Sequence, residues 1–126
     1  MIYSELTQHY FDAAADRAGR LTGPQVLHGE AGSIAQGTWV SFEVRAGVGG
    51  SIEEARFLAF GCPHVIAICA WVAEQAIGAP RQSARESVQA LRERFGVPYE
   101  KLGRLLVIED AWVACMGVAQ GSAPNE

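Results

Sequence analysis

The residues best suited to chemistry in this 126-residue sequence lie in one short segment, Phe60-Gly61-Cys62-Pro63-His64. A strand-like stretch precedes it, and proline is favoured in the first turn of a helix, so we expect Cys62 where a strand ends and a helix begins. Backbone N–H groups and the helix dipole stabilise a thiolate at such a junction. A nearby imidazole, His64, would lower the thiol pKa further or move its proton. We therefore predict Cys62 as a sulfur nucleophile or metal thiolate, with His64 as its helper.

A structural alternative exists for both residues. Free cysteines are among the most buried residue types, so Cys62 would then be a small core side chain and His64 a surface residue. A third interpretation makes Cys62 and His64 the nucleophile and base of a small-molecule enzyme. Side chains two residues apart at a turn rarely align for that chemistry, and we expect the protein not to be an enzyme.

The two remaining cysteines, Cys69 and Cys115, fall on the apolar faces of predicted helices, and we expect them to fill the core. A zinc site needs about four ligands and typically contains a close-spaced pair, whereas His9 and His28 are isolated. The sequence thus predicts no tightly bound cofactor and no self-contained metal site. An odd number of scattered cysteines also argues against a disulfide framework and favours a reducing compartment.

Composition narrows the possible partners. The chain is 49% hydrophobic and 19% charged, with a net charge of −4, which suits a single domain over residues 1–126. A mildly acidic chain without a basic cluster is not expected to bind nucleic acid. The longest apolar run, Val65 to Ala73, is too short to cross a bilayer, and the first residues lack the pattern of a secretory signal. We expect a cytoplasmic protein with no membrane partner.

Three stretches have strand patterns: residues 25–33, 38–45 and 51–60. In the second, Val40, Phe42 and Val44 alternate with Ser41, Glu43 and Arg45, the period of a half-buried strand. The glycine-rich turn at 47–50 joins the second and third stretches as an antiparallel hairpin.

Helical patterns surround these strands. Ser4 is a plausible N-cap for a helix from Glu5 to Ala18, and Pro63 opens a helix that ends near Gly78. Ser83 and Glu86 form a capping box at the start of a polar helix that extends to Phe95. The final helix is amphipathic, with apolar residues at Leu105, Ile108, Trp112, Cys115 and Ala119, and we expect residues 121–126 to be disordered. The predicted fold class is α+β, with a three-stranded antiparallel sheet packed against several helices.

Several strings in the sequence resemble the IscU/NifU N-terminal family of iron–sulfur cluster scaffold proteins. The strings are Tyr3-Ser4-Glu5 with His9-Tyr10, Ile52-Glu53-Glu54-Ala55-Arg56-Phe57 followed by Phe60-Gly61-Cys62, Val97-Pro98-Tyr99-Glu100-Lys101, and Glu109-Asp110-Ala111. The resemblance extends from about residue 3 to residue 119. It implies an IscU/SufE-like fold, an iron–sulfur cluster or zinc as the bound species, and a cysteine desulfurase or another assembly protein as partner.

The resemblance also implies which ligand positions have changed. The family site uses three cysteines, an aspartate and a histidine. Of these five ligand positions, this sequence keeps the family residue only at Cys62. The turn Ala35-Gln36-Gly37-Thr38 stands where the family has Ala-Cys-Gly-Asp, and Gly103-Arg104 stands where it has His-Cys. An iron–sulfur centre needs about four ligands, so Cys62 would bind metal only if a partner supplied the others.

Two functional hypotheses follow. In the first, Cys62 accepts or carries sulfur in iron–sulfur cluster assembly, as the single cysteine of SufE-type sulfur acceptors does. In the second, the protein is a non-catalytic interaction protein whose scaffold site has decayed. The predicted partner-binding residues are Gln36, Trp39, Pro98, Lys101 and Arg104.

Overall fold

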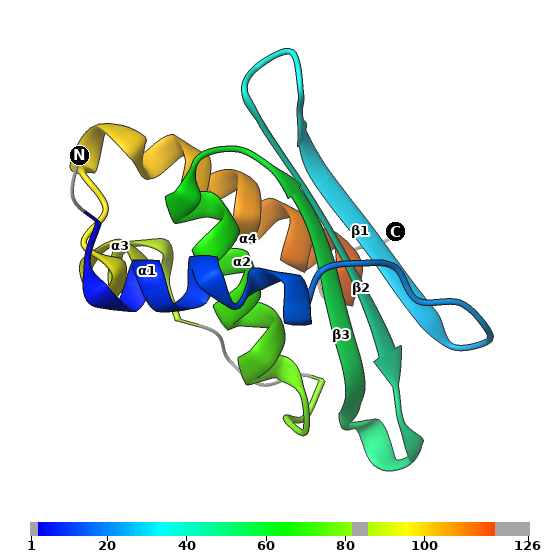
Figure 1. The fold of residues 1–126 in the computed structure, drawn as a ribbon. Helices are drawn as coiled ribbons and strands as arrows, with labels where there is room; N and C mark the ends of the chain where they lie inside the picture. Colours follow the sequence, from blue (N-terminus) through cyan, green and yellow to red (C-terminus); the bar gives the residue numbers. More distant parts are fainter. Residues whose placement is uncertain (1–2, 82–85, 118–126) are drawn as a thin grey trace.

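The computed structural model describes residues 3–81 and 86–117 and has four α-helices and three strands within these ranges (Figure 1). The elements are α1 (Glu5–Asp12), β1 (Val26–Ser33), β2 (Thr38–Ala46), β3 (Ile52–Phe60), α2 (Pro63–Ala76), α3 (Val88–Phe95) and α4 (Leu102–Met116). Short 3₁₀ helices lie at Ala14–Asp16, Val48–Gly50 and Tyr99–Lys101, the last of which is η3.

The strands form one antiparallel sheet in the order β1-β2-β3, as predicted. The side chains of Val40, Phe42 and Val44 are completely buried on one face of β2. Phe42 lies opposite Phe57 of β3, and its ring packs edge-on against Trp112 of α4 at a centroid distance of 5.1 Å. The period-2 pattern of β2 therefore identified the core face correctly.

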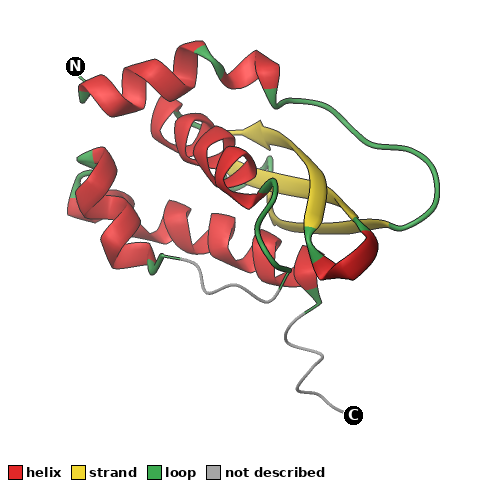
Figure 2. Ribbon diagram, turned by 90° about the horizontal axis from the view of Figure 1, so that it is seen from below, coloured by secondary structure: helices red, strands yellow, loops and turns green. Residues whose placement is uncertain are grey.

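Two helices cover this face of the sheet. Helix α2 packs on β3, and α4 lies across β1 and β2, while α1 and α3 contact the outer sides of α2 and α4 (Figures 1 and 2). Helix α2 is buried more widely than the predicted apolar stripe, since Ala67, Ile68 and Ala70 are buried as well. The reason is its position between the sheet and α1, which leaves little of its circumference in contact with water.

The contact between α4 and β1 depends on the absence of a side chain at Gly29. A Cβ atom at this position would lie 2.0 Å from the backbone nitrogen of Cys115 in α4. Three residues further along β1, a Cβ at Gly32 would lie 2.2 Å from the Thr38 carbonyl oxygen and 2.8 Å from Val107 Cγ1. The backbone of α4 therefore lies closer to β1 than any side chain at residue 29 would allow.

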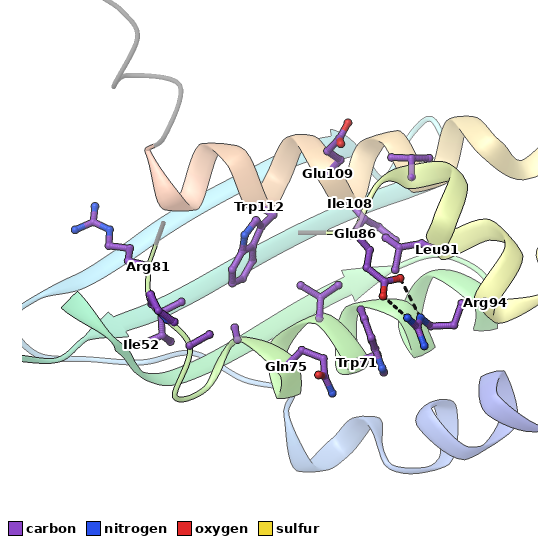
Figure 3. A pocket seen from close by; sticks show the side chains of 15 residues that line it. Ile52, Trp71, Gln75, Arg81, Glu86, Leu91, Arg94, Ile108, Glu109 and Trp112 are labelled. Carbon is purple, nitrogen blue, oxygen red and sulfur yellow. Dashed lines mark hydrogen bonds and ion pairs between the residues drawn. The ribbon is translucent and has the colours of Figure 1, made fainter. Parts of the chain in front are cut away.

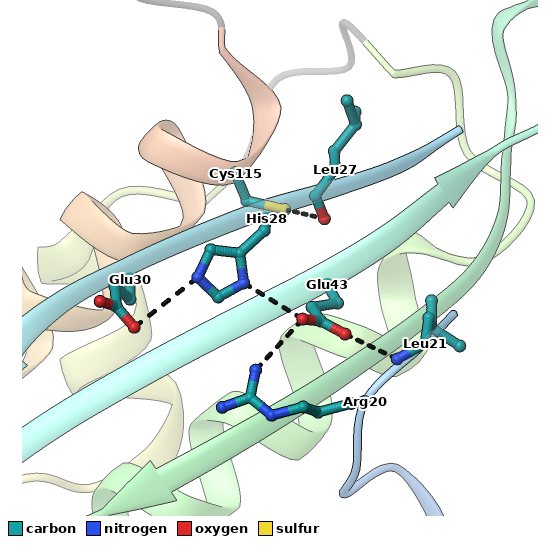
Figure 4. Close-up of polar contacts among 7 residues, drawn as sticks. All are labelled: Arg20, Leu21, Leu27, His28, Glu30, Glu43 and Cys115. Atoms are coloured by element: carbon teal, nitrogen blue, oxygen red, sulfur yellow. Dashed lines mark hydrogen bonds and ion pairs between the residues drawn. The ribbon is translucent and has the colours of Figure 1, made fainter. Parts of the chain in front are cut away.

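The opposite face of β2 is also covered, which the alternating pattern did not predict. Ser41 and Glu43 are only 1% and 8% exposed, and residues 17–22 cross this face beside Glu43 on their way to β1. The Glu43 carboxylate accepts hydrogen bonds from the Leu21 backbone N–H (2.6 Å) and Arg20 (3.2 Å), and it lies 3.2 Å from Nδ1 of His28 (Figure 4). Burial alone would raise the pKa of Glu43, but these contacts lower it, so the carboxylate stays charged.

The boundaries of three helices differ from their predictions. Helix α1 has the predicted Ser4 N-cap but ends at Asp12, where a 3₁₀ turn replaces the predicted continuation. Helix α3 begins at Val88 with Ser87 as its N-cap, and the predicted cap Ser83 lies outside the described residues. Glu86 instead pairs with Arg94. The last helix ends at Met116, and the predictions for Ala119 and the tail 121–126 fall outside the described residues.

We expect the substitution Gly29→Ala to lower the free energy of unfolding by about 3 kcal/mol, because α4 must move away from β1 to admit the methyl group. Urea denaturation followed by circular dichroism would measure the loss. The matched control is Gly103→Ala, since Gly103 lies in α4 where an added Cβ meets no atom within 4 Å. That variant should gain about 0.5–1 kcal/mol from helix propensity. Equal stability of the two variants would contradict the packing argument.

Candidate functional site

Cys62 occupies the junction that the sequence predicted. Strand β3 ends at Phe60, and Cys62 is the N-cap residue of α2, with extended backbone angles (φ −77°, ψ 169°) and Pro63 in the first turn. Its side chain is half-buried, so the sulfur belongs neither to the core nor to a fully exposed surface. The strand-to-helix turn thus places one thiol at the N-terminus of a 14-residue helix.

The surroundings of Cys62 favour the thiolate. Partial burial would raise the pKa of this thiol, but four groups together lower it below its ordinary value. They are the backbone N–H groups of Val65 and His64, the Arg104 guanidinium and the charge of Lys101. Two of these groups come from α2 and two from the η3–α4 segment. A helix N-terminus and two cations therefore act together to favour the anionic form of the sulfur.

The other two thiols are inert by comparison, as predicted. Cys69 is completely buried in α2, and burial raises the pKa of its thiol far above its ordinary value. Cys115 is buried in α4, its Sγ lies 3.5 Å from the Leu27 carbonyl oxygen, and burial raises its pKa to about 12 (Figure 4). Of the three cysteines, Cys62 is the one whose surroundings lower the thiol pKa.

His64 is buried, with 3% of its surface exposed, which excludes the alternative that it is a surface residue. Its Nδ1 lies 3.4 Å from Lys101 Nζ, and its ring meets Tyr3 edge-on at a centroid distance of 4.7 Å. Burial, together with the charges of Lys101 and Arg104, lowers the pKa of His64. The imidazole is therefore neutral at pH 7 and accepts a hydrogen bond from the Lys101 ammonium.

This arrangement changes the part that His64 plays at the site. A neutral imidazole supplies no positive charge to the thiolate, and its side-chain partners are Lys101 and Tyr3. Its contribution to the sulfur is indirect, through the position of Lys101. Tyr3, whose ring also lies 6.0 Å from Lys101 Nζ, was not predicted as a site residue. The local sequence around Tyr3 gives no sign that it contacts His64 and Lys101. These two residues lie about 60 and 100 positions further along the chain.

The structure separates the five predicted partner-binding residues into two groups. Lys101 in η3 and Arg104 in the first turn of α4 both lower the pKa of Cys62. Trp39 pairs with Phe60, which lies two residues before Cys62 in the chain. Gln36 lies exposed in the β1–β2 turn, where its N–H donates to Ser33, and Pro98 precedes η3. In the described part of the chain, no hydrogen bond or ion pair connects Gln36 or Pro98 to Cys62.

The site does not fit a metal or a cluster that this chain would hold alone. Within residues 3–81 and 86–117, no group of three or more histidine, cysteine, aspartate or glutamate side chains is placed to bind a metal ion. The side chains that lower the pKa of Cys62 are both cations, and a guanidinium repels a metal ion instead of ligating it. The donor set consists of one thiolate, against the four that an iron–sulfur centre requires.

A cavity of about 500 Å³ lies elsewhere, between α2, α3 and α4 (Figure 3). Trp71 and Trp112 line it, and Arg94 pairs with Glu86 at its edge while stacking on Trp71 at 5.0 Å. Trp71 is nine residues along α2 from Cys62, roughly 13 Å along the helix axis. None of the predicted site residues lines this cavity.

Comparison with known proteins identifies the family. The NifU-like N terminal domain family matches residues 2–116. The chain belongs to this family. NifU-like proteins of this kind are iron–sulfur cluster assembly scaffolds, so the resemblance drawn from the sequence strings is confirmed.

Solved structures of NifU-like proteins share the fold. One is described as an iron–sulfur cluster assembly scaffold protein for the SUF system from Fervidobacterium islandicum AW-1, with a TM-score of 0.68 at 16% identity over 92% of this chain and 94% of that one. Another is the N-terminal part of a nitrogen-fixing NifU-like protein from Brucella abortus, with a TM-score of 0.65 at 16% identity over 95% of each chain. No curated protein matches the sequence. Among the described residues of this NifU-like chain, no helix is long and apolar enough to span a bilayer.

The charge arrangement predicts how alkylation of Cys62 depends on pH. Because Arg104 lowers the thiol pKa, Arg104→Gln should raise it, and a smaller fraction of Cys62 will be thiolate at any given pH. Iodoacetamide labelling over a range of pH, with peptide mass spectrometry to assign the modified cysteine, would measure the midpoint. Arg45→Gln is the matched control, since Arg45 donates to the Thr22 carbonyl near the other end of β2. An unchanged midpoint in Arg104→Gln would show that the guanidinium does not act on the sulfur.

Proposed function

We propose that this NifU-like protein carries sulfur for iron–sulfur cluster assembly on Cys62 and does not build a cluster alone. The feature that supports this function is the Arg104 guanidinium, which lowers the pKa of Cys62 and stands where the family resemblance places the third cysteine. Arg104 stabilises a sulfur anion and disfavours a metal cation. A persulfide carries the same negative charge as the thiolate from which it forms, so the same groups stabilise both the empty and the loaded carrier.

The transfer step needs only a donor persulfide, for which a cysteine desulfurase is the proposed source. The Cys62 thiolate attacks the outer sulfur of the donor persulfide, and a new S–S bond forms. The S–S bond of the donor breaks, and its electron pair leaves with the donor sulfur as a thiolate. The proton of the donor persulfide moves with the transferred sulfur and is then lost to water, which leaves the loaded carrier as a persulfide anion. No external oxidant or reductant is consumed, and Cys62 acts as a stoichiometric carrier and not as an enzyme.

The proposal predicts selective loading of Cys62. Incubation of the protein with a cysteine desulfurase and cysteine should add the mass of one sulfur atom to the peptide that contains Cys62. Cys69 and Cys115 should stay unmodified, because both are buried and protonated. Intact-mass and peptide-mass spectrometry before and after reduction would measure the reaction.

The control is the Cys62→Ser variant, which should gain no sulfur while unfolding at the same urea concentration as the parent protein. Equal labelling of Cys62→Ser, or an unmodified parent protein in the presence of active desulfurase, would exclude the carrier function. Loading of Cys69 would show that the core opens in solution.

The ligand count makes a separate prediction about metals. After addition of zinc, or of iron and sulfide under reducing conditions, the purified chain should retain much less than one metal ion per molecule after desalting. Elemental analysis and visible absorption would measure the bound metal. The double variant Arg104→Cys, Gly103→His restores two ligand types and should retain more. Tight, stoichiometric metal in the parent protein would contradict the proposal.

A second candidate function is that of an interaction protein whose binding surface lies beside Cys62. It rests on the exposure of Phe60, which is 48% accessible at the end of β3 and lies opposite Trp39. Aromatic side chains at an exposed edge are typical of protein interfaces. The desulfurase experiment distinguishes the two functions, since a stable complex without sulfur transfer, retained by Cys62→Ser, would favour this one.

A further inference from the structure

We propose that the cavity between α2, α3 and α4 binds an uncharged aromatic molecule that carries a hydrogen-bond acceptor, such as an aryl ketone. The cavity has a volume of about 500 Å³, within the range of about 300–1,000 Å³ that is typical of small-molecule pockets. An apolar cavity of about 150 Å³ is already large enough to hold benzene. Cys62 does not line this cavity, so the binding function is separate from the carrier function.

The cavity has aromatic walls that other side chains hold in place. The Arg94 guanidinium lies over the ring of Trp71 at 5.0 Å, and the Phe95 ring meets the same indole edge-on at 5.9 Å. Trp112 on the other side packs edge-on against Phe42 at 5.1 Å. The aliphatic lining residues are Ile52, Val72, Val88, Leu91 and Ile108. Indole rings pack favourably against other aromatic rings, and walls that are already ordered reduce the entropic cost of binding.

The charges around the cavity favour an uncharged ligand. Arg94 pairs with Glu86 at the edge of the cavity. The guanidinium of Arg81 donates to the Met116 carbonyl at 3.3 Å, and the charged ends of Arg81 and Glu109 point away from the two tryptophans (Figure 3). Among the described residues, the ionised side chains that line the cavity are therefore two arginines and two glutamates, which cancel. An ionic ligand would lose its hydration there without gaining a counter-charge.

Trp112 supplies a polar group that an acceptor on the ligand would satisfy. The residue is only 5% exposed, and within residues 3–81 and 86–117 its indole N–H donates no hydrogen bond. An indole N–H can only donate, and a buried one usually has a partner. A carbonyl oxygen on the ligand would provide that partner, whereas a hydrocarbon would leave the N–H unpaired.

The test compares three naphthalene probes of similar size on the full chain. The uncharged ketone 2-acetylnaphthalene carries an acceptor, 2-ethylnaphthalene carries none, and 2-naphthoate is an anion. Calorimetry would give the dissociation constants, and NMR would follow the indole N–H signals. We expect the ketone to bind at least ten-fold more tightly than the anion and to shift the Trp112 signal. Trp112→Phe should weaken the ketone about five-fold relative to the hydrocarbon, since only the ketone loses a hydrogen bond.

A second variant tests the location without removing a core indole. Val72→Phe adds a ring to the lining of the cavity and should weaken binding of the ketone at least ten-fold. The matched control is Val48→Phe, which adds the same group at a fully exposed turn residue outside the cavity and should leave the affinity unchanged.

Four results would overturn the inference. They are no binding of the ketone, equal affinity for the ketone and the anion, equal effects of Trp112→Phe on the ketone and the hydrocarbon, and signal shifts confined to Trp39, which lies outside the cavity. Each of these results would leave sulfur loading of Cys62 untouched, because that reaction is measured separately and at a different site.

Discussion

The approach of α4 to β1 at Gly29 is the contact on which the rest of the molecule depends. Because residue 29 has no side chain, the backbone of α4 reaches the strand, and Leu105, Ile108 and Trp112 fill the core above the sheet. The other end of the same helix lies near α2, where Lys101 Nζ, directly before α4, is 3.4 Å from Nδ1 of His64.

The chemistry of the site follows from the type of charge that the fold brings to Cys62. Further thiolates, histidine or carboxylate beside a thiolate favour a bound metal ion, whereas guanidinium and ammonium groups favour an anion and disfavour a metal cation. The change from one to the other requires no change of fold. Arg104 occupies the position where the resemblance to NifU-like proteins places a cysteine, and the backbone around it remains that of the family.

Two buried polar side chains, Glu43 and His64, show how the fold accommodates groups that are costly to desolvate. Glu43 stays charged because a backbone N–H, a guanidinium and an imidazole satisfy its oxygens. His64 instead stays neutral, because two cations face it and it can accept the Lys101 hydrogen bond without a charge. In both places burial is tolerated because the protonation state matches the neighbouring charges.

The sequence by itself determined the elements, the core face of β2, the strand-to-helix junction at Cys62, and the inert character of Cys69 and Cys115. These features depend on periodicity, proline placement and local caps, which act over a few residues. It also indicated the family, through short strings around Cys62. Only the tertiary structure decided that His64 is buried against Lys101 and Tyr3, that residues 17–22 cover Glu43, and that Arg104 lowers the pKa of Cys62. Each of these features depends on segments about 20 to 60 residues apart. No local sequence pattern predicts where α4 crosses β1. The Cβ clearance at Gly29 sets that crossing, and it exists only once both elements are packed.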